Sequence, residues 1–473
     1  MEQWSSRLGF VLASIGAAVG LGNVWRFSAV VGANGGGAYL VPYAVAFFCF
    51  ALPLVVLELA AGREFRADVV TTFRAVHRRL DVVGWLVVGI VVVVVSYYLV
   101  ITGWTLAFLV VWVGGFDTTF AGYTGSPWPL VTFVVTTAIA AGVLSLGVKE
   151  GIERLSTILV PLVFVILLGM AAYAVTLSGF SPAVDFLFAP DFSVLGDPLL
   201  WGAAFGQAFF SLSAGQGILL TYGSYLDEST GLLRNAGVIA VADFSVAMLA
   251  GLVIFPVVFT YGLEPTLGTE LAFTTLPQAF AAMPGGRLVG VAFFGLLFFA
   301  AITSAVSMLE VAIAATMRTG RVGRGRATAA VTAVVIALGL PSALSYSSIG
   351  LAVEGIPFLD VLDETVGTLG LPVTALCIAL AFAWGVPGER MRAAVGLDAA
   401  HLIAKYVLPL VLVLVIGLRV GLGFSAAGWH VLPGVGALRE NRLTPLAIFA
   451  VLAVFGYALS WVRRSKRRRR NRS

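Results

Sequence analysis

Long runs of apolar residues, separated by short polar connections, extend along the whole chain. Most are at least as long as the roughly 20 residues that an α-helix needs to cross a hydrocarbon layer about 30 Å thick. We therefore predict an all-α polytopic membrane protein with about 12 transmembrane helices, forming a single membrane domain over residues 1–473. The predicted spans are 8–31, 38–62, 82–114, 128–147, 155–178, 199–225, 233–262, 286–317, 325–343, 354–385, 403–423 and 444–462.

The composition supports this interpretation. Of the 473 residues, 59% are hydrophobic and only 11% are charged, too few to cover a soluble domain of this size. The first run, from Leu8, lacks a basic leader and a small-residue cleavage site, so we expect a retained helix rather than a signal peptide. Cys49 and Cys377 both lie in apolar runs, which favours neither a disulfide framework nor a metal cluster.

Basic residues predict the orientation. They gather in alternate connections, which share one side with an Arg-rich tail at 463–473, whereas the connection 263–285 carries Glu264 and Glu270. The positive-inside rule makes the basic side cytoplasmic, so we expect both termini inside the cell and the chain in the cell membrane. The basic residues of these connections are Arg63, Arg66, Arg74, Arg78, Arg79, Lys149, Arg154, Arg318, Arg321, Arg324, Arg326, Arg390, Arg392 and Lys405.

The net charge of +5 and the basic tail also raise the question of a nucleic-acid partner. A basic block directly after a hydrophobic helix is more typical of a cytoplasmic anchor, held by anionic lipid headgroups at about 1 kcal/mol per charge. We expect anionic lipid at the tail and no nucleic acid. The sequence leaves the oligomeric state open.

Two spans carry a glycine cluster beside polar residues near their middle, at 16–23 and at 211–217. Small residues also allow helices to pack closely, so each cluster alone has a second explanation. As a pair in corresponding spans, the clusters favour discontinuous helices around a site at mid-membrane depth. There, unwound backbone offers carbonyls to cations and half-helix N-termini offer N–H groups to anions.

Several ordered motifs extend this picture. The chain resembles the neurotransmitter:sodium symporter family, in its prokaryotic branch with the leucine-transporter fold, from Trp4 to about Phe382. The resemblance implies a 5+5 inverted repeat, 8–178 and 199–385, with discontinuous first and sixth helices and two further helices in 403–462. The matching motifs are Arg7–Phe10, Val19–Phe27, Asn34–Tyr39, Tyr97-Tyr98, Gly206–Ser213 and Thr303-Ser304.

The resemblance implies two Na⁺ sites, whose hard oxygen ligands lipid does not supply. In the first, the substrate carboxylate would complete the shell, which couples ion and substrate binding. The first set is the Ala18 carbonyl with Asn23, Ser211 and Asp243; the second is the carbonyls of Gly16, Val19 and Ala300 with the hydroxyls of Thr303 and Ser304. The alternative for the two hydroxyls is hydrogen bonding within their own helix.

Asp243 bears on anion dependence. Chloride-dependent relatives typically have Asn here and Ser one turn later, whereas this chain has Asp243 and Ala247. A carboxylate at the site would balance the Na⁺ charge, so we predict transport without chloride. The alternative is an aspartate at a helix end that faces water; an ionisable residue inside a span otherwise marks a functional site.

The same resemblance implies an amino-acid pocket. The N–H groups of Leu21 and Gly22 and the Tyr98 hydroxyl would bind the carboxylate. Considered without the motif, Tyr98 would more often be a packing residue. The carbonyls of Ala18, Phe210 and Ser211 with the Ser213 hydroxyl would bind the ammonium, and Ala17, Val94, Phe210, Gln216 and Met308 would surround the side chain. Gln216 replaces the usual Phe or Met, and either contacts a polar substrate group or reaches a water-filled vestibule. We favour a hydrophobic or aromatic amino acid.

Two gates are expected around this pocket. Outside, Arg26 would pair with Asp363, bridged by Gln207 and lying above Phe210. Inside, Trp4 and Tyr225 match the family, but its basic–acidic pair is missing. Three explanations remain open: a sign-swapped pair of Glu2 with Arg318, a start assigned too late, or Arg318 as an ordinary positive-inside residue.

The function predicted from the sequence is therefore Na⁺-coupled amino-acid import by alternating access. The alternative on the same fold is a sensor that binds an amino acid without transporting it, which would have little need of two sodium sites. A channel needs a continuous polar path, and no nucleophile–base set suggests an enzyme.

Overall fold

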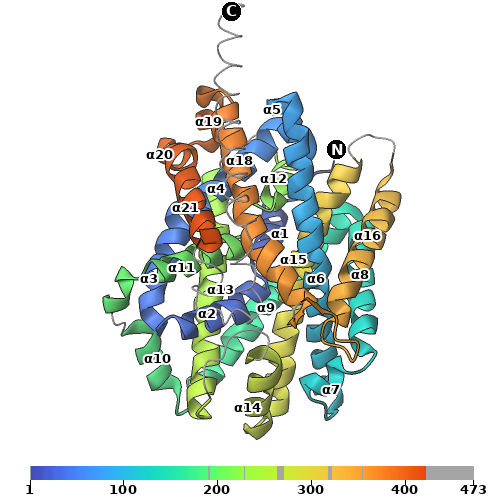
Figure 1. Ribbon diagram of the computed structural model, residues 1–473, viewed down its shortest axis with the longest axis vertical. Helices are drawn as coiled ribbons and strands as arrows, with labels where there is room; N and C mark the ends of the chain where they lie inside the picture. Colours follow the sequence, from blue (N-terminus) through green and yellow to red (C-terminus); the bar gives the residue numbers. More distant parts are fainter. Residues whose placement is uncertain are drawn as a thin grey trace, which may run out of the picture.

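Long helices run between two ends of the molecule in the computed structural model (Figure 1). The structure describes residues 2–189, 192–227, 230–263, 271–317, 322–353 and 355–421. Within these residues, nine helices are long and apolar enough to cross a membrane, and one bent pair of helices adds a further span. The all-helical membrane architecture predicted from the sequence is confirmed. The last predicted span, 444–462, and the basic tail, 463–473, lie outside the described residues.

The helices follow the apolar runs closely, because a continuous helix is the way a lipid-exposed segment satisfies its backbone within itself. Their bounds are α1 Arg7–Ala18, α2 Phe27–Ala33, α3 Leu40–Ala46, α4 Leu52–Phe65, α5 Val69–Val76, α6 Asp81–Gly114, α7 Phe120–Thr124, α8 Trp128–Ser145, α9 Arg154–Ala174, α10 Phe180–Phe188, α11 Pro198–Ser211, α12 Ile218–Gly223, α13 Leu232–Thr260, α14 Leu276–Ala282, α15 Gly286–Met317, α16 Arg324–Leu344, α17 Phe358–Leu362, α18 Leu371–Gly385, α19 Gly388–Val395, α20 Asp398–Leu402 and α21 Leu408–Gly421. Strands β1 Ala352–Val353 and β2 Ile356–Pro357 form one antiparallel pair.

Both glycine clusters coincide with breaks. The first span stops at Ala18 and resumes in a π-helical turn, Gly22–Arg26, that continues into α2, with a bend of 54°. The second break separates α11 from α12. There Ser213, Gly215 and Gly217 have φ angles of +51°, +89° and +71°, which end a right-handed helix. The predicted discontinuities are present at the predicted places.

The broken helices lie against the most buried spans. α15 packs on α6, α9 and α1, and α13 packs on α1 and on the turn Gly22–Arg26. In their most apolar stretches α6 and α15 are 72% buried, whereas the span that contains α9 is only 28% buried. The outer helices therefore turn apolar surface outward, while α6 and α15 form the wall of the interior.

Basic connections gather at one end of the molecule. The Arg63 guanidinium donates to the carbonyls of Thr230 (2.8 Å) and Ala394 (2.9 Å), and Arg390 pairs with Glu64. These residues lie at the end that carries α5 and α19, while α7, α10 and α14 lie at the other (Figure 1). The connections that carry Arg63 and Arg390 thus share a side, as their charge predicted. The short helices α5, α7, α10, α14 and α19 were not predicted, because segments of five to nine residues carry little periodicity.

Candidate functional site

Three predicted ligands of the first sodium site meet beside the break in the first span. Asn23 Nδ2 donates to Asp243 Oδ1 (2.7 Å), to Ser211 Oγ (2.8 Å) and to the Asp243 carbonyl (3.4 Å), and Ser211 Oγ donates to Asp243 Oδ2 (2.6 Å). All three side chains are buried. Asp243 lies in the middle of α13, so the alternative of a water-facing helix end is wrong. The amide nitrogen is thus surrounded by oxygens from two other spans.

The groups of the second predicted site meet between α1 and α15. Ser304 Oγ lies 3.2 Å from the Gly16 carbonyl, 3.1 Å from that of Val19 and 3.2 Å from that of Ala300. Thr303 Oγ1 instead bonds within its own helix, to the carbonyls of Phe299 and Ala300. The Thr303 hydroxyl therefore bonds within its own helix, which is the alternative raised by the sequence. The Ser304 hydroxyl contacts both its own helix and the carbonyls of Gly16 and Val19.

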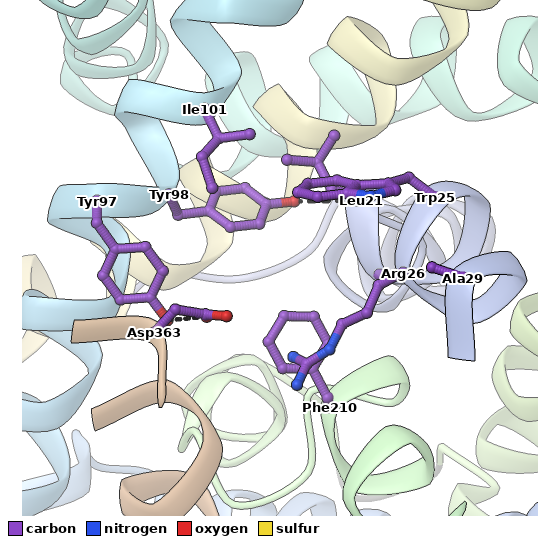
Figure 2. Close-up of a pocket in the computed structure, with 10 residues that line it drawn as sticks. Leu21, Trp25, Arg26, Ala29, Tyr97, Tyr98, Ile101, Phe210 and Asp363 are labelled. Carbon is purple, nitrogen blue, oxygen red and sulfur yellow. Dashed lines mark hydrogen bonds between the residues drawn. The ribbon is translucent and has the colours of Figure 1, made fainter. Parts of the chain in front are cut away.

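A cavity opens beside the first break, between the turn Gly22–Arg26, α6 and the residues Phe210 and Asp363 (Figure 2). The cavity together with the open space at its mouth amounts to about 480 Å³. Its wall includes four predicted pocket residues, and the Leu21 N–H points to the Tyr98 hydroxyl at 3.3 Å. The lining residues are Leu21, Gly22, Trp25, Arg26, Ala29, Tyr97, Tyr98, Ile101, Phe210 and Asp363.

The backbone approaches this cavity so closely that glycine is required. A Cβ on Gly22 would lie 2.6 Å from the Phe210 ring, and one on Gly20 would lie 2.8 Å from both Tyr98 Oη and Ser304 Oγ. Real Cβ atoms do not tolerate such contacts. The glycines of the first cluster thus let the backbone of the break lie directly against the Phe210 ring and the Tyr98 hydroxyl.

Three predicted outer-gate residues, Arg26, Phe210 and Asp363, border the same cavity. The Arg26 guanidinium stacks 4.2 Å above the Phe210 ring and donates to Thr368 Oγ1 at 3.4 Å. Asp363 accepts from the Tyr97 hydroxyl at 2.9 Å, and it faces Arg26 across the cavity (Figure 2). Gln207 Nε2 donates to the Gly22 carbonyl at 2.8 Å, and within the described ranges Gln207 Oε1 has no hydrogen-bond partner. Its bridging role stays a prediction.

The remaining pocket residues are buried but do not line this cavity. Ser213 Oγ donates to the Ala17 carbonyl at 3.0 Å and joins the two breaks directly. The side chains of Val94, Gln216 and Met308 are all at most 4% exposed. Gln216 Oε1 is buried and has no hydrogen-bond partner among the described residues, so it does not reach a water-filled vestibule in this conformation.

On the opposite side, the N-terminal segment closes the route to the breaks. Trp4 Nε1 donates to the Tyr222 carbonyl at 3.1 Å, and the Tyr225 hydroxyl donates to Glu310 Oε1 at 2.8 Å. Glu2 pairs with Arg324 at 3.2 Å. Arg318, the partner suggested by the sequence, lies outside the described residues.

Two buried carboxylates escaped the sequence analysis. Glu58 Oε1 in α4 accepts from the Gly215 N–H at 2.6 Å and holds the second break, and Glu310 in α15 pairs with Arg324 at 2.5 Å. Both side chains are fully buried. The available signal was an ionisable residue inside an apolar run, which marks function by default.

Comparison with known proteins agrees with this geometry. The profile of the Sodium:neurotransmitter symporter family matches residues 1–118 and 119–396. The chain belongs to this family. A sodium-dependent transporter of Methanocaldococcus jannaschii, itself uncharacterized, is 33% identical over 83% of both chains. An uncharacterized sodium-dependent transporter of Bacillus subtilis is 34% identical over 80% of this chain and 86% of its own.

A solved structure shares the fold of this sodium:neurotransmitter symporter family member. The crystal structure of MhsT in complex with L-phenylalanine superposes with a TM-score of 0.82 at 37% identity, covering 90% of this chain and all of that one. The protein is therefore a multi-pass membrane transporter of a sodium-dependent family and not an enzyme.

Proposed function

We propose that this protein imports an amino acid by symport with Na⁺, without chloride, through alternating access. The observation that carries the proposal is the meeting of Asn23, Ser211 and Asp243 beside the broken first span. Three oxygens surround the Asn23 amide nitrogen there: Ser211 Oγ, Asp243 Oδ1 and, more distantly, the Asp243 carbonyl. Such a group of hard oxygens suits Na⁺ once the Asn23 amide turns its own oxygen toward it.

The absence of a chloride requirement follows from charge. A cation in a buried site needs a nearby anion, because its desolvation is otherwise uncompensated. Asp243 supplies a carboxylate within the site, and the buried Ala247 one turn later offers an anion no hydrogen bond. The protein's own carboxylate thus takes the place of an external anion.

A second Na⁺ is proposed between α1 and α15. The carbonyls of Gly16, Val19 and Ala300 already lie within 3.2 Å of Ser304 Oγ, so small rearrangements would close a shell of five oxygens with Thr303. Such an ion would join the half-helix α1 to the wall formed by α15. Its departure would free α1, which is the step toward opening on the N-terminal side.

For the substrate we propose a hydrophobic or aromatic amino acid. Its carboxylate would bind the Leu21 and Gly22 N–H groups and Tyr98 Oη, and its ammonium the carbonyls near Ser213. MhsT, which was solved with L-phenylalanine, is similar over 90% of this chain and supports this class. Each bound partner raises the affinity of the other by the same factor, which couples transport to the ion gradient.

The orientation completes the proposal. The basic end, with the N-terminal segment, would face the cytoplasm by the positive-inside rule. The cavity at Tyr98, Arg26 and Asp363 would then open outward, and basic residues near the membrane would attract anionic lipid.

Uptake in proteoliposomes tests the proposal. Accumulation of L-phenylalanine driven by an inward Na⁺ gradient, unchanged when gluconate replaces chloride, is the expected result. Uptake that persists with K⁺ in place of Na⁺ would reject sodium coupling, and strong loss in gluconate would reject chloride independence. Na⁺-dependent binding without accumulation of any of the twenty amino acids would identify a sensor instead.

A further inference from the structure

The short helix α5 lies against the second break. It belongs to the connection between two spans, yet Val69 in its first turn lies beside Gly217, the residue directly before α12. A Cβ on Gly217 would lie 2.9 Å from Val69 Cγ2 and 3.4 Å from Val87 Cγ1 of α6. Both valines are fully buried. The backbone of the break thus packs directly on α5.

The buried face of α5 fixes the position of this helix. A Cβ on Gly84 of α6 would lie only 2.7 Å from Val70 Cα, so the two helices touch through their backbones there. The Phe73 ring packs on Phe382 of α18, with centroids 4.9 Å apart. The Asp68 side chain caps α5 by accepting from a backbone N–H of its first turn at 3.1 Å. α5 is therefore held against α6 and α18 as well as against the break.

The opposite face of α5 carries positive charge at the basic end of the molecule (Figure 1). Arg74 in α5 and Arg78 and Arg79 in the turn that follows are all exposed, and we call these three arginines the basic corner. His77 Nδ1 accepts from the Arg79 N–H at 3.2 Å, which fixes the turn where α5 ends. Asp81 in the first turn of α6 offsets one of the three charges.

An apolar stripe on α6 begins directly after the basic corner. Val82, Trp85 and Leu86 are 72%, 49% and 46% exposed, and their spacing places them on one side of the helix. α6 is part of a membrane span, so these exposed side chains face lipid. Because tryptophan is enriched at the level of the headgroups, the stripe places the basic corner at the depth of the lipid phosphates.

We propose that the basic corner binds the headgroup of an anionic phospholipid and so holds α5 against the second break. A phosphodiester accepts the charge-assisted hydrogen bonds that guanidinium groups donate. The proposal rests on the proposed function in taking the break as part of the substrate site, and it adds control of that site by the lipid composition of the membrane.

The length of α5 explains how the lipid would act on the break. Its eight residues span about 12 Å, so one helix contacts the break at its first turn and the headgroup layer at its end. Each arginine near an anionic surface is worth roughly fivefold in affinity. A zwitterionic lipid offers no net charge, so α5 would then be held by packing alone, and the backbone of the break would fluctuate more.

Cross-linking to a photoreactive phospholipid tests the binding. The protein is reconstituted in vesicles of phosphatidylglycerol and phosphatidylcholine, and one of the two lipids carries a diazirine on its acyl chain. We expect the phosphatidylglycerol probe to label the peptide 78–90 at least about fivefold more than the phosphatidylcholine probe. Equal labelling by the two probes would overturn the site. Loss of the preference in excess inorganic phosphate would do so too, because it would indicate a site for free phosphate.

Two triple variants test which arginines cause this preference. Arg74→Gln with Arg78→Gln and Arg79→Gln should remove the preference while leaving the melting temperature in phosphatidylcholine unchanged, since all three side chains are exposed. The control removes the same charge from three exposed arginines in other connections: Arg154→Gln, Arg326→Gln and Arg392→Gln. The control should keep the preference, and an equal loss in both variants would overturn the assignment to the basic corner.

Hydrogen–deuterium exchange tests the connection to the break without requiring transport. Amides of residues 212–219 should exchange several-fold more slowly in phosphatidylglycerol than in phosphatidylcholine, whereas those of α8 should not differ. Val69→Ala removes the contact with Gly217 and keeps the arginines, so it should abolish this difference and leave the cross-linking preference intact. Exchange at 212–219 that is the same in both lipids in the parent would overturn control of the break.

The outcomes also separate this proposal from the proposed function. Lipid-selective cross-linking and exchange in a parent that shows no Na⁺-driven uptake would keep the lipid site and reject the symporter. Na⁺-driven uptake in a parent without lipid-selective cross-linking would keep the symporter and reject the lipid site.

Discussion

Asn23 Nδ2 lies 2.7 Å from Asp243 Oδ1, which joins the broken first span to the middle of α13 in the buried interior. An amide that donates to a carboxylate, a hydroxyl and a carbonyl stands where a cation would find the same oxygens. This relationship is the basis for the ion specificity proposed above, and it is open to direct tests.

Replacing the Asp243 carboxylate should make transport depend on chloride. We expect Asp243→Asn to reduce Na⁺-driven uptake more than about tenfold, because a buried cation loses its counter-charge. Adding Ala247→Ser should restore part of the uptake in chloride but not in gluconate. Asp185→Asn, on an exposed face of α10, is the control, and full activity of Asp243→Asn in gluconate would contradict the charge argument.

The second ion site should depend on one hydroxyl. Ser304→Ala removes the only side chain seen to contact both α1 carbonyls and α15 in the described part of the chain. We expect the Na⁺ concentration for half-maximal uptake to rise about tenfold, in line with about 1.4 kcal/mol for a buried polar contact. Ser245→Ala removes a hydroxyl that bonds only within its own helix; an equal shift in that variant would show a general effect of serine loss.

Side-chain selectivity should follow Gln216. In the described part of the chain its buried Oε1 has no hydrogen-bond partner, so a substrate with a side-chain N–H or O–H would gain a hydrogen bond there. Gln216→Met should therefore lower the affinity for tyrosine or tryptophan relative to phenylalanine by about tenfold, the value of one well-placed hydrogen bond. Competition against labelled phenylalanine measures the ratio. An unchanged ratio would place Gln216 outside the substrate contact.

Gly22 should tolerate no side chain. A Cβ there would lie 2.6 Å from the Phe210 ring, so Gly22→Ala should abolish substrate-induced stabilisation in a thermal-shift assay. Gly142→Ala, where a Cβ meets nothing within 4 Å, should behave as the parent. Phe210→Val should restore part of the binding to Gly22→Ala, and failure of this rescue would locate the damage in the backbone.

The sequence predicted the helical spans and both breaks because apolar length and glycine clusters are local signals. The resemblance to the family also led us to expect Asn23, Ser211 and Asp243 at one site, and their side chains do meet; that they bind Na⁺ stays a prediction. The sequence could not predict that Glu2 meets Arg324, because that pairing depends on where three helix ends converge. Glu58 and Glu310 were visible as carboxylates in apolar runs, but their partners at Gly215 and Arg324 are distant in the chain.

The second break has a mechanical meaning of its own. The Gly215 N–H is bound to Glu58 of α4, so residues 212–217 are held at one point while α11 and α12 extend from them as separate short rods. A half-helix that ends at the substrate site can tilt about that end without moving the other half-helix. Glu58 would then be the fixed point of this movement, and the closed side of the protein could change from one membrane face to the other while the substrate stays in place.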